Sequence, residues 1–496
     1  MTLTVPSQIP ATMPTPPSSA PDTAGTSPVR ELFNDGNVKI EQIYEEETDS
    51  KGNTYVLREE VRITTSDKAD QVRIHAGADG QVNARINGQL HQLPLDRGDP
   101  YQTLIITTAG GDDRVVVDPD INVAVNISTG DGNDRIIAGG GNTRVFAGKG
   151  DDFIRLGSGK GLAFGEDGND LMLAGTGDAV MSGGKGEDRM YAGLGPAHRV
   201  VYLSGDEGND ELYGGDGKVV LNGGLDNDKL VGYRRTTMYT GGGQDSVHSF
   251  DANDSIYAKN TDSIHNHKGA AVTEVRTNSA GKHGFKIEGS PEFIARVENK
   301  LEELRGSPVG QKLLEEMDRL AKKIGHPVLI SSAPEDGNIS TYHFETAFTQ
   351  SLTRKALRQY DDKPEIGHIK DGVPGAIATQ AKIVFASDTL DWRLGVSPLI
   401  ALFHEMIHAY NGATGTRIPG SQPLLDKDGQ PVLRGGEPVS ESIDELQAVG
   451  IPNAGEAFDF DNDPSTPPTT INPYPLYENA LRKELDIPLR ERYYPI

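Results

Sequence analysis

Apolar and polar residues alternate along the chain from about residue 36 to residue 104. Segments such as 38–43 (VKIEQI) and 72–75 (VRIH) carry an apolar side chain at every second position, which is the period of a strand with one buried face. Turn-forming residues, as at 50–53 (SKGN), separate these runs. We therefore expect short antiparallel strands over residues 31–104, placed to cover the exposed end of the next segment.

A repeat of about 18 residues follows, in which turns of the form Gly-x-Gly-x-Asp-x-apolar recur. Successive turn aspartates are 21, 18, 18, 18, 22, 18 and 17 positions apart. Two nonapeptides make one full coil of a parallel β-roll, which we predict for residues 105–250. Pieces such as 129–136 (TGDGNDRI) and 183–190 (GGKGEDRM) resemble the RTX, or hemolysin-type, calcium-binding repeat. The turn aspartates are Asp113, Asp134, Asp152, Asp170, Asp188, Asp210, Asp228 and Asp245.

Aspartate occupies every second nonapeptide of this repeat, whereas intervening turns such as 157–162 (GSGKGL) lack it. The aspartates should therefore stack along one edge of the roll, with plain glycine turns along the other. Because Ca²⁺ prefers carboxylate and carbonyl oxygens, the acidic edge is a candidate calcium site. The alternative is that Asp and Asn serve only as turn residues, with no ion bound. The candidate ligands are Asp134, Asp152, Asp170, Asp188, Asp210 and Asp228.

The periodicity fades over residues 251–283, where polar residues dominate, and we interpret this segment as the end of the roll and a linker. Two amphipathic helices are expected next, because apolar residues recur every three or four positions from 293 to 304 and from 309 to 324. The apolar runs 328–330 (VLI) and 383–385 (IVF) predict short strands. We expect the second run to be an edge strand that can pair with an extended peptide.

A further helix is predicted to begin near Ser397. Ser397 is suited to the N-cap and Pro398 to the first turn, and the apolar run 399–403 (LIALF) follows them. The sequence Asn-Gly at 411–412 is a typical helix end. Such a helix would be about three to four turns long and mostly buried.

Residues 404–408 of this helix read HExxH. On a helix His404 and His408 share one face and can bind one tetrahedral Zn²⁺ ion. Glu405 then stands where a general base would activate a zinc-bound water. The alternative is a core helix whose histidines bond to backbone groups. The longer metzincin pattern HExxHxxGxxH is absent, since Asn411 and Thr414 stand at its last two fixed positions.

A zinc site needs a third protein ligand, and a carboxylate on a second helix is the simplest source. Residues 440–450 (SESIDELQAVG) predict such a helix and contain three acidic residues. We favour Glu445, with Asp444 and Glu441 as alternatives. Ser442 and Glu445 also fit a capping box, which would turn this carboxylate toward the backbone instead.

Composition and charge narrow the choice of function. A chain of 496 residues exceeds what one core holds, and its 59 glycines fit a repeat region. The absence of cysteine excludes disulfides and thiolate metal sites. A net charge of −25 argues against binding to nucleic acid or to an anionic membrane. We expect no membrane span, because no apolar run is long enough, and no signal-peptide pattern is present.

From about residue 284 to residue 496 the chain resembles the NleD-type zinc metalloprotease domain of type III secretion effectors and related bacterial toxins. The resemblance is carried, in the family's order, by residues 285–293 (FKIEGSPEF), 404–411 (HEMIHAYN), 445–450 (ELQAVG) and 477–490 (YENALRKELDIPLR). It implies hydrolysis of peptide bonds in host proteins, with signalling kinases as known targets of the family. His404, His408 and Glu445 are the zinc ligands that it implies, with Glu405 as the base.

The oxyanion of a tetrahedral intermediate needs a donor besides the metal. We assign this role to Tyr493, which follows the last matching segment, with Tyr477, Arg482 and Arg490 as rivals. Packing is the alternative function for each of these side chains.

Residues 1–30 are rich in Pro, Ser and Thr and are expected to be disordered. This composition resembles a type III secretion signal, which implies delivery into a host cell and a secretion chaperone as partner; a plain flexible tail is the alternative. The expected architecture is multidomain, with a β-rich N-terminal half containing a parallel β-roll or solenoid and an α+β zincin-like metalloprotease domain over 284–496. Two other functions stay open: a calcium-binding RTX-like adhesin or interaction protein with a non-catalytic C-terminal domain, and an antibacterial toxin protease.

Overall fold

The computed structural model describes residues 29–48, 54–78, 80–96, 102–276, 278–334, 340–351, 363–387, 397–426, 429–434, 437–461 and 463–492. The segment interpreted as a secretion signal lies almost entirely outside the described residues. None of the described helices is long and apolar enough to cross a membrane.

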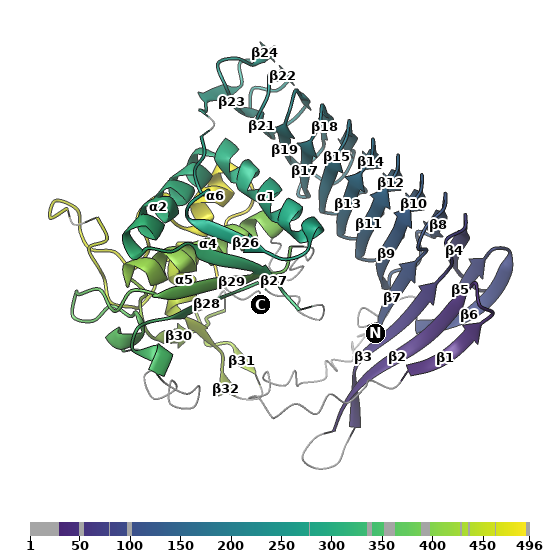
Figure 1. Cartoon of the computed structure of the whole chain (residues 1–496), viewed down its shortest axis with the longest axis horizontal. Helices are drawn as coiled ribbons and strands as arrows, with labels where there is room; N and C mark the ends of the chain where they lie inside the picture. Colours follow the sequence, from purple (N-terminus) through teal and green to yellow (C-terminus); the bar gives the residue numbers. More distant parts are fainter. Residues whose placement is uncertain are drawn as a thin grey trace, which may run out of the picture.

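Two long β-sheets make up the N-terminal half (Figure 1). The first contains β1 (Val29–Asn34), β2 (Lys39–Thr48), β3 (Thr54–Thr64), β7 (Gln102–Thr107), β9 (Ala124–Asp131), β11 (Thr143–Lys149), β13 (Gly161–Asp167), β15 (Ala179–Lys185), β17 (Val200–Glu207), β19 (Lys218–Leu225), β21 (Thr236–Tyr239), β23 (Ser255–Ala258) and β25 (Ala271–Glu274). The second contains β4 (Gln71–Ala76), β5 (Gln81–Ile86), β6 (Gln89–Asp96), β8 (Arg114–Val117), β10 (Arg135–Ile137), β12 (Phe153–Arg155), β14 (Leu171–Leu173), β16 (Arg189–Gly193), β18 (Glu211–Gly215), β20 (Lys229–Gly232), β22 (Ser246–Ser249) and β24 (Ser263–Asn266). From β7 onward the chain alternates between the sheets and each strand pairs in parallel with the next coil, so this half is the predicted parallel β-solenoid.

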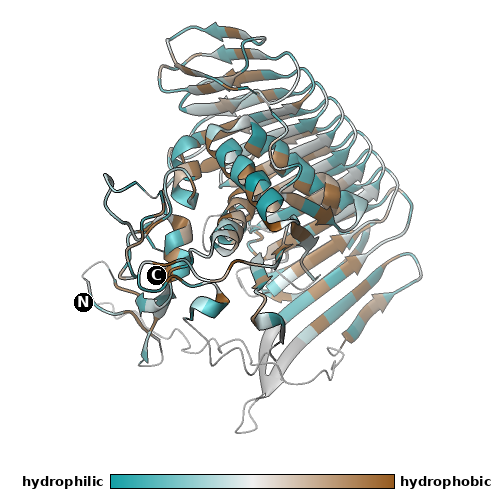
Figure 2. Cartoon of the chain, turned by 60° about the vertical axis from the view of Figure 1, so that its left-hand side comes forward, coloured by the Kyte–Doolittle hydropathy of each residue, from teal (hydrophilic) through white to brown (hydrophobic). Residues whose placement is uncertain are grey.

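Each coil of the solenoid contributes inward-facing aliphatic side chains to one continuous core. Val145, Ala163 and Met181 stack in successive coils, 18 residues apart, and each has 0% exposure. Residues between the inward positions face outward, and apolar and polar residues alternate along many of the strands (Figure 2). With a period of 18 residues, each inward-facing side chain stacks on the equivalent side chain of the next coil. This stacking fills the narrow core between the two sheets.

The antiparallel strands expected at residues 31–104 extend both sheets. β1, β2 and β3 pair in antiparallel order, as do β4, β5 and β6. β3 then pairs in parallel with β7, and β4 with β8. Both hairpin groups therefore lie against the first coil of the solenoid and cover its open edge.

The solenoid continues past residue 250. β23, β24 and β25 pair in parallel with strands of the preceding coil. The end of the roll, expected within residues 251–283, therefore reaches Glu274, beyond the predicted repeat boundary at residue 250. Inward-facing Ile256, 1% exposed, keeps the apolar position of the repeat, although the Gly-x-Gly-x-Asp turns that marked earlier coils are lost.

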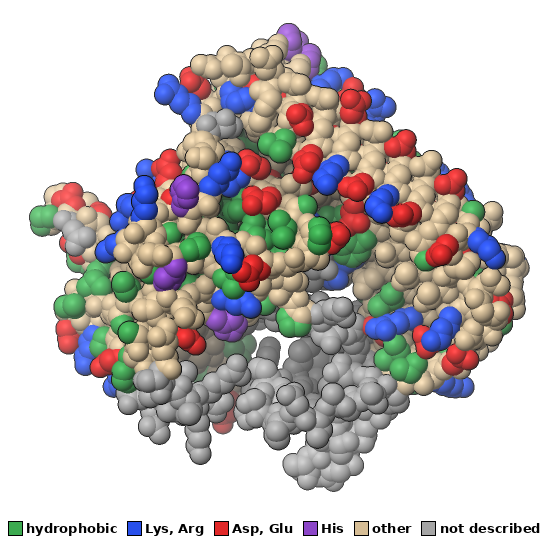
Figure 3. Space-filling model, in the orientation of Figure 1, with side chains coloured by type: hydrophobic (Ala, Val, Ile, Leu, Met, Phe, Trp, Pro, Cys, Tyr) green, Lys and Arg blue, Asp and Glu red, His purple; other side chains and the backbone are tan. Residues whose placement is uncertain are grey.

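Ion pairs join neighbouring coils along the solenoid surface. Lys149 Nζ lies 3.1 Å from Asp131, and Lys185 Nζ lies 3.9 Å from Asp167. Each pair is exposed and contributes at most about 1 kcal/mol to stability. Figure 3 shows acidic and basic side chains interspersed over this face of the molecule, so the net negative charge does not gather into one patch here.

A four-stranded sheet and a set of helices form the C-terminal region. Its elements are β26 (Phe285–Glu288), α1 (Pro291–Gly306), α2 (Pro308–Ile324), β27 (Val328–Ser332), β28 (Thr341–Glu345), η1 (Thr349–Ser351), η2 (Pro364–Ile366), β29 (Gln380–Phe385), α4 (Pro398–Thr414), β30 (Ser421–Pro423), β31 (Leu433–Arg434), β32 (Glu437–Pro438), β33 (Ser440–Ser442), α5 (Ile443–Val449) and α6 (Glu478–Glu484). The main sheet has the order β26-β27-β29-β28. This is the α+β region expected behind the solenoid.

Strand β28 was not predicted, and it changes the edge of this sheet. It pairs antiparallel with β29, which lies between β27 and β28. The prediction that residues 383–385 form an edge strand is therefore wrong, because β28 covers that side. In the described part of the chain β28 itself pairs with no other strand.

The C-terminal region packs on the outer face of the first solenoid sheet (Figure 1). Tyr202 and Tyr239 of that face belong to the same hydrophobic cluster as the residues of α1, α2 and α4. The Tyr202 hydroxyl donates to Glu303 of α1 at 2.5 Å, and the Tyr239 hydroxyl donates to Glu484 of α6 at 3.0 Å. The core of the C-terminal region therefore extends onto the outer face of the solenoid, whose interior keeps a separate core.

Candidate metal centre

Helix α4 begins as the sequence predicts. Ser397 is its N-cap, and the Ser397 side chain accepts the N–H of Ile400 at 3.4 Å. Pro398 occupies the first helical turn. Every residue of α4 except Ala401 and Thr414 is buried, because α2, α5, α6 and the main sheet surround it. The helix therefore carries its polar residues through the middle of the C-terminal core.

The end of α4 differs from the prediction at residues 411–412. The helix continues to Thr414, and Gly415 ends it in the left-handed conformation. Gly412 lies inside the helix, where an added Cβ would come within 2.3 Å of the Tyr342 hydroxyl on β28. Glycine at this position therefore serves the close packing of β28 on α4 and does not mark a stop.

The side chains of His404, His408 and Glu445 converge beside α4. His404 Nε2 lies 3.1 Å from His408 Nε2, and Glu445 Oε2 lies 3.0 Å and 3.1 Å from these two nitrogens. Two imidazole nitrogens and one carboxylate oxygen facing a common point form a donor set that zinc prefers. Among the residues that the structure describes, this is the one cluster of His, Cys, Asp or Glu side chains with such an arrangement.

Glu445 reaches the histidines from α5. The capping box weighed for Ser442 and Glu445 is not formed, since Ser442 makes no side-chain cap bond and its hydroxyl instead contacts Asp444. The Asp444 carboxylate is ion-paired with Arg417. Glu441 belongs to β33, because residues 440–442 form a strand with β30 and the predicted helix starts later. Neither alternative ligand belongs to the cluster.

Charge interactions within the cluster oppose the effect of burial. Burial disfavours the ionised imidazole of His404, but hydrogen bonds with Glu445 and Glu478 outweigh it and raise the pKa of His404 to about 10. Burial also disfavours ionised Glu445, yet the charge on His408 and hydrogen bonds from both histidines hold its pKa well below the usual value. Burial raises the pKa of Glu405, which is 8% exposed. Metal binding would therefore release protons from the histidines.

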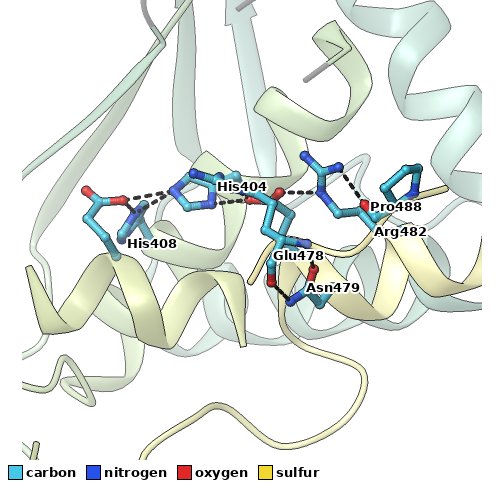
Figure 4. Close-up of polar contacts among 8 residues, drawn as sticks. His404, His408, Glu478, Asn479, Arg482 and Pro488 are labelled. Atoms are coloured by element: carbon cyan, nitrogen blue, oxygen red, sulfur yellow. Dashed lines mark hydrogen bonds and ion pairs between the residues drawn. The ribbon is translucent and has the colours of Figure 1, made fainter. Parts of the chain in front are cut away.

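Glu478 lies behind His404, on the side away from Glu445 (Figure 4). Its Oε2 is 2.9 Å from His404 Nδ1, and the residue is completely buried. It also accepts hydrogen bonds from Arg482 and Arg490. The sequence reasoning assigned no role to Glu478. The available signal was its place within the resembling segment 477–490, four residues before Arg482.

A ladder of buried aspartates runs along one edge of the solenoid. From Asp134 to Asp245, each Oδ1 accepts the backbone N–H of the aspartate one coil earlier, at 2.7 to 2.9 Å. The other oxygen, Oδ2, is buried without a hydrogen-bond partner in Asp152, Asp170, Asp188, Asp210 and Asp228. Burial raises the pKa of Asp152 to about 8 and that of Asp228 to about 9. The ladder contains every aspartate named as a candidate calcium ligand, on one edge as expected.

Glycine keeps room for these carboxylates. An added Cβ at Gly183 would lie 2.0 Å from Asp188 Oδ2, and one at Gly205 would lie 2.1 Å from Asp210 Oδ2. Gly183 and Gly205 each stand five residues before their aspartate, directly before the repeat turn, and leave the space into which Oδ2 points.

Comparison with known families gives a family match for each half of the chain. Residues 281–493 match the Peptidase_M91 family model, which is described as an effector protein. The C-terminal region is a Peptidase_M91 effector domain. Residues 127–162, 164–196 and 204–234 match the RTX calcium-binding nonapeptide repeat, so the solenoid is built from RTX repeats. Both resemblances drawn from the sequence are confirmed. No significant match is found among curated proteins or among solved structures.

The M91 domain leaves the oxyanion donor unassigned. Tyr493 lies outside the described residues. Tyr477 is the N-cap of α6, and its ring packs against Gly450, where an added Cβ would lie 2.3 Å away. Arg482 and Arg490 both bond to Glu478, so their guanidinium groups hold this carboxylate.

Proposed function

We propose that the M91 domain is a zinc endopeptidase that hydrolyses peptide bonds of protein substrates, with Zn²⁺ held by His404, His408 and Glu445. The convergence of two Nε2 atoms and one Oε2 atom within about hydrogen-bond distance carries this proposal. The donor types fit the ion, since two histidines and one glutamate leave a fourth position for water or substrate. Zinc held there would polarise the scissile carbonyl and lower the pKa of the attacking water.

Glu405 is the proposed general base. It follows His404 on a helix that is buried on nearly all sides, and its carboxylate interacts electrostatically with both imidazoles. It would take a proton from the attacking water and pass that proton to the nitrogen of the leaving peptide. Low water access around Glu405, which is 8% exposed, favours this transfer over exchange with solvent.

Strand β28 is the proposed substrate-binding edge. Tyr342 of β28 lies parallel to the His408 ring, with ring centroids 6.5 Å apart. A substrate segment that paired with the outer edge of β28 would therefore run alongside the histidines. Such pairing uses main-chain hydrogen bonds and holds the peptide extended, which is the form that a protease must cleave.

The RTX ladder is the proposed calcium site. Buried Oδ2 atoms without hydrogen-bond partners are costly unless a cation or proton meets them. An effector peptidase family joined to RTX repeats is consistent with a secreted protein. We propose delivery into a host cell through type III secretion, with a chaperone for the N-terminal segment. The family resemblance makes host signalling kinases the first substrates to test.

Glu405→Gln tests the proposed enzyme most directly. We expect this variant to keep about one zinc per chain by elemental analysis but to lose cleavage of host-cell proteins, detected by labelling new N-termini in a lysate. His408→Ala should lose both zinc and cleavage. Glu441→Gln is a matched control, because Glu441 lies outside the cluster, and it should keep both. Unchanged cleavage by Glu405→Gln would exclude the proposed mechanism and favour a non-catalytic interaction domain.

A further inference from the structure

We propose that Glu478 is the positioning residue of the metal centre, fixing the ring of His404 so that its Nε2 faces the zinc site. This inference rests on the proposed function. The carboxylate is 2.9 Å from Nδ1, on the opposite side of the ring from Glu445 and His408. When Nδ1–H donates to Glu478, the lone pair of His404 must be on Nε2. The contact therefore selects both the tautomer and the rotation of the ring.

Two arginines hold Glu478 in turn. Arg482 Nε donates to Oε1 at 2.6 Å from one turn further along α6, and Arg490 donates to Oε2 at 2.9 Å. Figure 4 shows Glu478 between His404 and Arg482. A carboxylate with no exposed surface needs such partners, because an unpaired buried charge is strongly unfavourable. The side chain thus has little freedom to leave His404.

Hydrogen bonds between α6 and the segment that follows it hold Arg490 in place. Asn479 donates to the carbonyl oxygen of Arg490 at 2.9 Å and accepts its N–H at 2.8 Å. Arg482 also donates to the carbonyl oxygen of Pro488 at 3.0 Å. The segment 477–490 therefore forms one unit whose polar groups converge on the back of a single imidazole.

The two histidines differ in this respect. Among the described residues, the carboxylate of Glu478 meets His404 Nδ1, whereas the ion pair found for His408 involves only its Nε2 atom and Glu445. Glu478 should therefore act on the metal through His404 alone. Loss of such a contact commonly weakens metal binding 10- to 100-fold.

Glu478→Gln is the test, because it keeps the size of the side chain and removes its charge. We expect zinc affinity, measured by competition with a fluorescent chelator, to fall about 10- to 100-fold. The visible spectrum of the Co²⁺-loaded protein should also shift, since it reports ligand orientation. The matched control is Glu484→Gln, a half-buried glutamate of α6 that contacts Ser307, Tyr239 and Val309 and not the cluster. It should bind both metals as the wild type does.

The outcomes separate this inference from the proposed function. Wild-type zinc affinity and an unchanged Co²⁺ spectrum in Glu478→Gln would overturn the positioning role, while the Glu405→Gln result could still support a zinc peptidase. Equal weakening in Glu478→Gln and Glu484→Gln would also overturn it, because the effect would then come from disturbed packing of α6. Thermal unfolding of each metal-free variant shows whether the fold is kept. If Glu478→Gln does not fold, Arg490→Gln, which removes one clamp, replaces it under the same criteria.

Discussion

Charge pairing decides which carboxylate near α5 faces the histidines. Asp444 and Glu445 are neighbours, but Arg417 holds the Asp444 carboxylate, and Ser442 contacts it as well. A charge-paired acid does not readily change partner, because the half-buried Arg417 would be left without a counter-charge. Glu445 has the two imidazoles instead. Glu445 has no arginine partner and is therefore the carboxylate that is available to bind a metal.

Substitution of these two neighbours should have opposite consequences. Glu445→Gln removes the charged oxygen from the proposed donor set, so we expect purified protein to lose stoichiometric zinc while its fold is kept. Asp444→Asn should keep zinc but destabilise the chain by about 1–3 kcal/mol, since Arg417 loses its ionic partner. Elemental analysis and urea unfolding measure the two effects. Zinc retained in Glu445→Gln and lost in Asp444→Asn would make Asp444 the ligand.

The sequence predicts the order and period of the elements in the solenoid, because each coil repeats the same packing. The 18-residue coils were predictable because one apolar position per strand and one Asp turn per coil recur, as Val145, Ala163 and Met181 illustrate. The last coils were missed because they keep inward residues such as Ile256 but lose the turn consensus. Strand β28 was missed although polar and aromatic residues alternate along TYHFE, because the run is only five residues long. The histidine pair was predictable from local spacing, whereas Glu478 contacts it from 74 positions away.

The aspartate ladder predicts how the stability of the solenoid depends on calcium and pH. Burial raises the pKa of Asp188 to about 8 from the ordinary value of 3.8. The folded chain therefore holds protons more tightly than the unfolded chain, and calcium-free stability should fall as pH rises from about 4 through 8. Calcium replaces those protons, so it should raise the melting temperature more at pH 8 than at pH 5. With calcium at 100 times Kd, each site adds about 2.7 kcal/mol.

Calorimetry of the full chain with Ca²⁺ or with a chelator measures this effect. Asp188→Asn keeps an oxygen acceptor for the backbone of Asp170 and removes one charge. It should be more stable than the wild type without calcium at pH 8, and should gain less when calcium is added. Equal melting temperatures with and without calcium at pH 8 would show that these aspartates act as turn residues alone.

The contact between the solenoid and the M91 domain occurs where the repeat is broken. In neighbouring coils Gly148, Gly184 and Gly224 occupy one register position, but Glu166 and Asp206 stand there in two coils. Both adopt positive φ, 79° and 76°, a conformation that costs a non-glycine residue about 1–2 kcal/mol. The sequence shows that these two positions depart from the repeat, but it does not show which contacts compensate the cost of the backbone strain.

Polar contacts at the interface with helix α1 supply that compensation. Glu166 pairs with Arg296 at 3.3 Å. Asp206 accepts a hydrogen bond from the Ser204 hydroxyl at 2.7 Å, and Ser204 also contacts Glu303. Strain in two turns of the solenoid is therefore tolerated where acidic groups meet polar side chains of the interface. Glycine would suit the backbone better at both positions, but it would remove the ionic partner of Arg296 and an acceptor of the Ser204 hydroxyl.

The energies of their contacts predict different outcomes for glycine substitutions of Glu166 and Asp206. The Glu166 and Arg296 side chains are 32% and 23% exposed, so their ion pair contributes only about 0.2–1 kcal/mol. Glu166→Gly removes about 1–2 kcal/mol of strain. It also loses the ion pair and adds about 0.5–1 kcal/mol of backbone entropy cost, so the unfolding free energy should change by less than about 1 kcal/mol. Asp206 is 4% exposed, and its loss removes the acceptor of the buried Ser182 hydroxyl and one of the two acceptors of the buried Ser204 hydroxyl. Loss of these hydrogen bonds in Asp206→Gly should lower the unfolding free energy by about 1–3 kcal/mol. Relief of backbone strain should return about 1 kcal/mol of this loss.

Calorimetry of the full chain in calcium tests this difference, with limited proteolysis to detect separation of the two halves. Asp167→Asn is the matched control, because its exposed carboxylate lies in the same turn as Glu166 and faces Lys185 of the next coil. It should leave both readouts unchanged. Asp206→Gly should lower the melting temperature and increase cleavage between solenoid and M91 domain. An Asp206→Gly chain that melts at or above the wild-type temperature would mean that strain outweighs the contact, and that the shared apolar core around Tyr202 and Tyr239 holds the halves together without it.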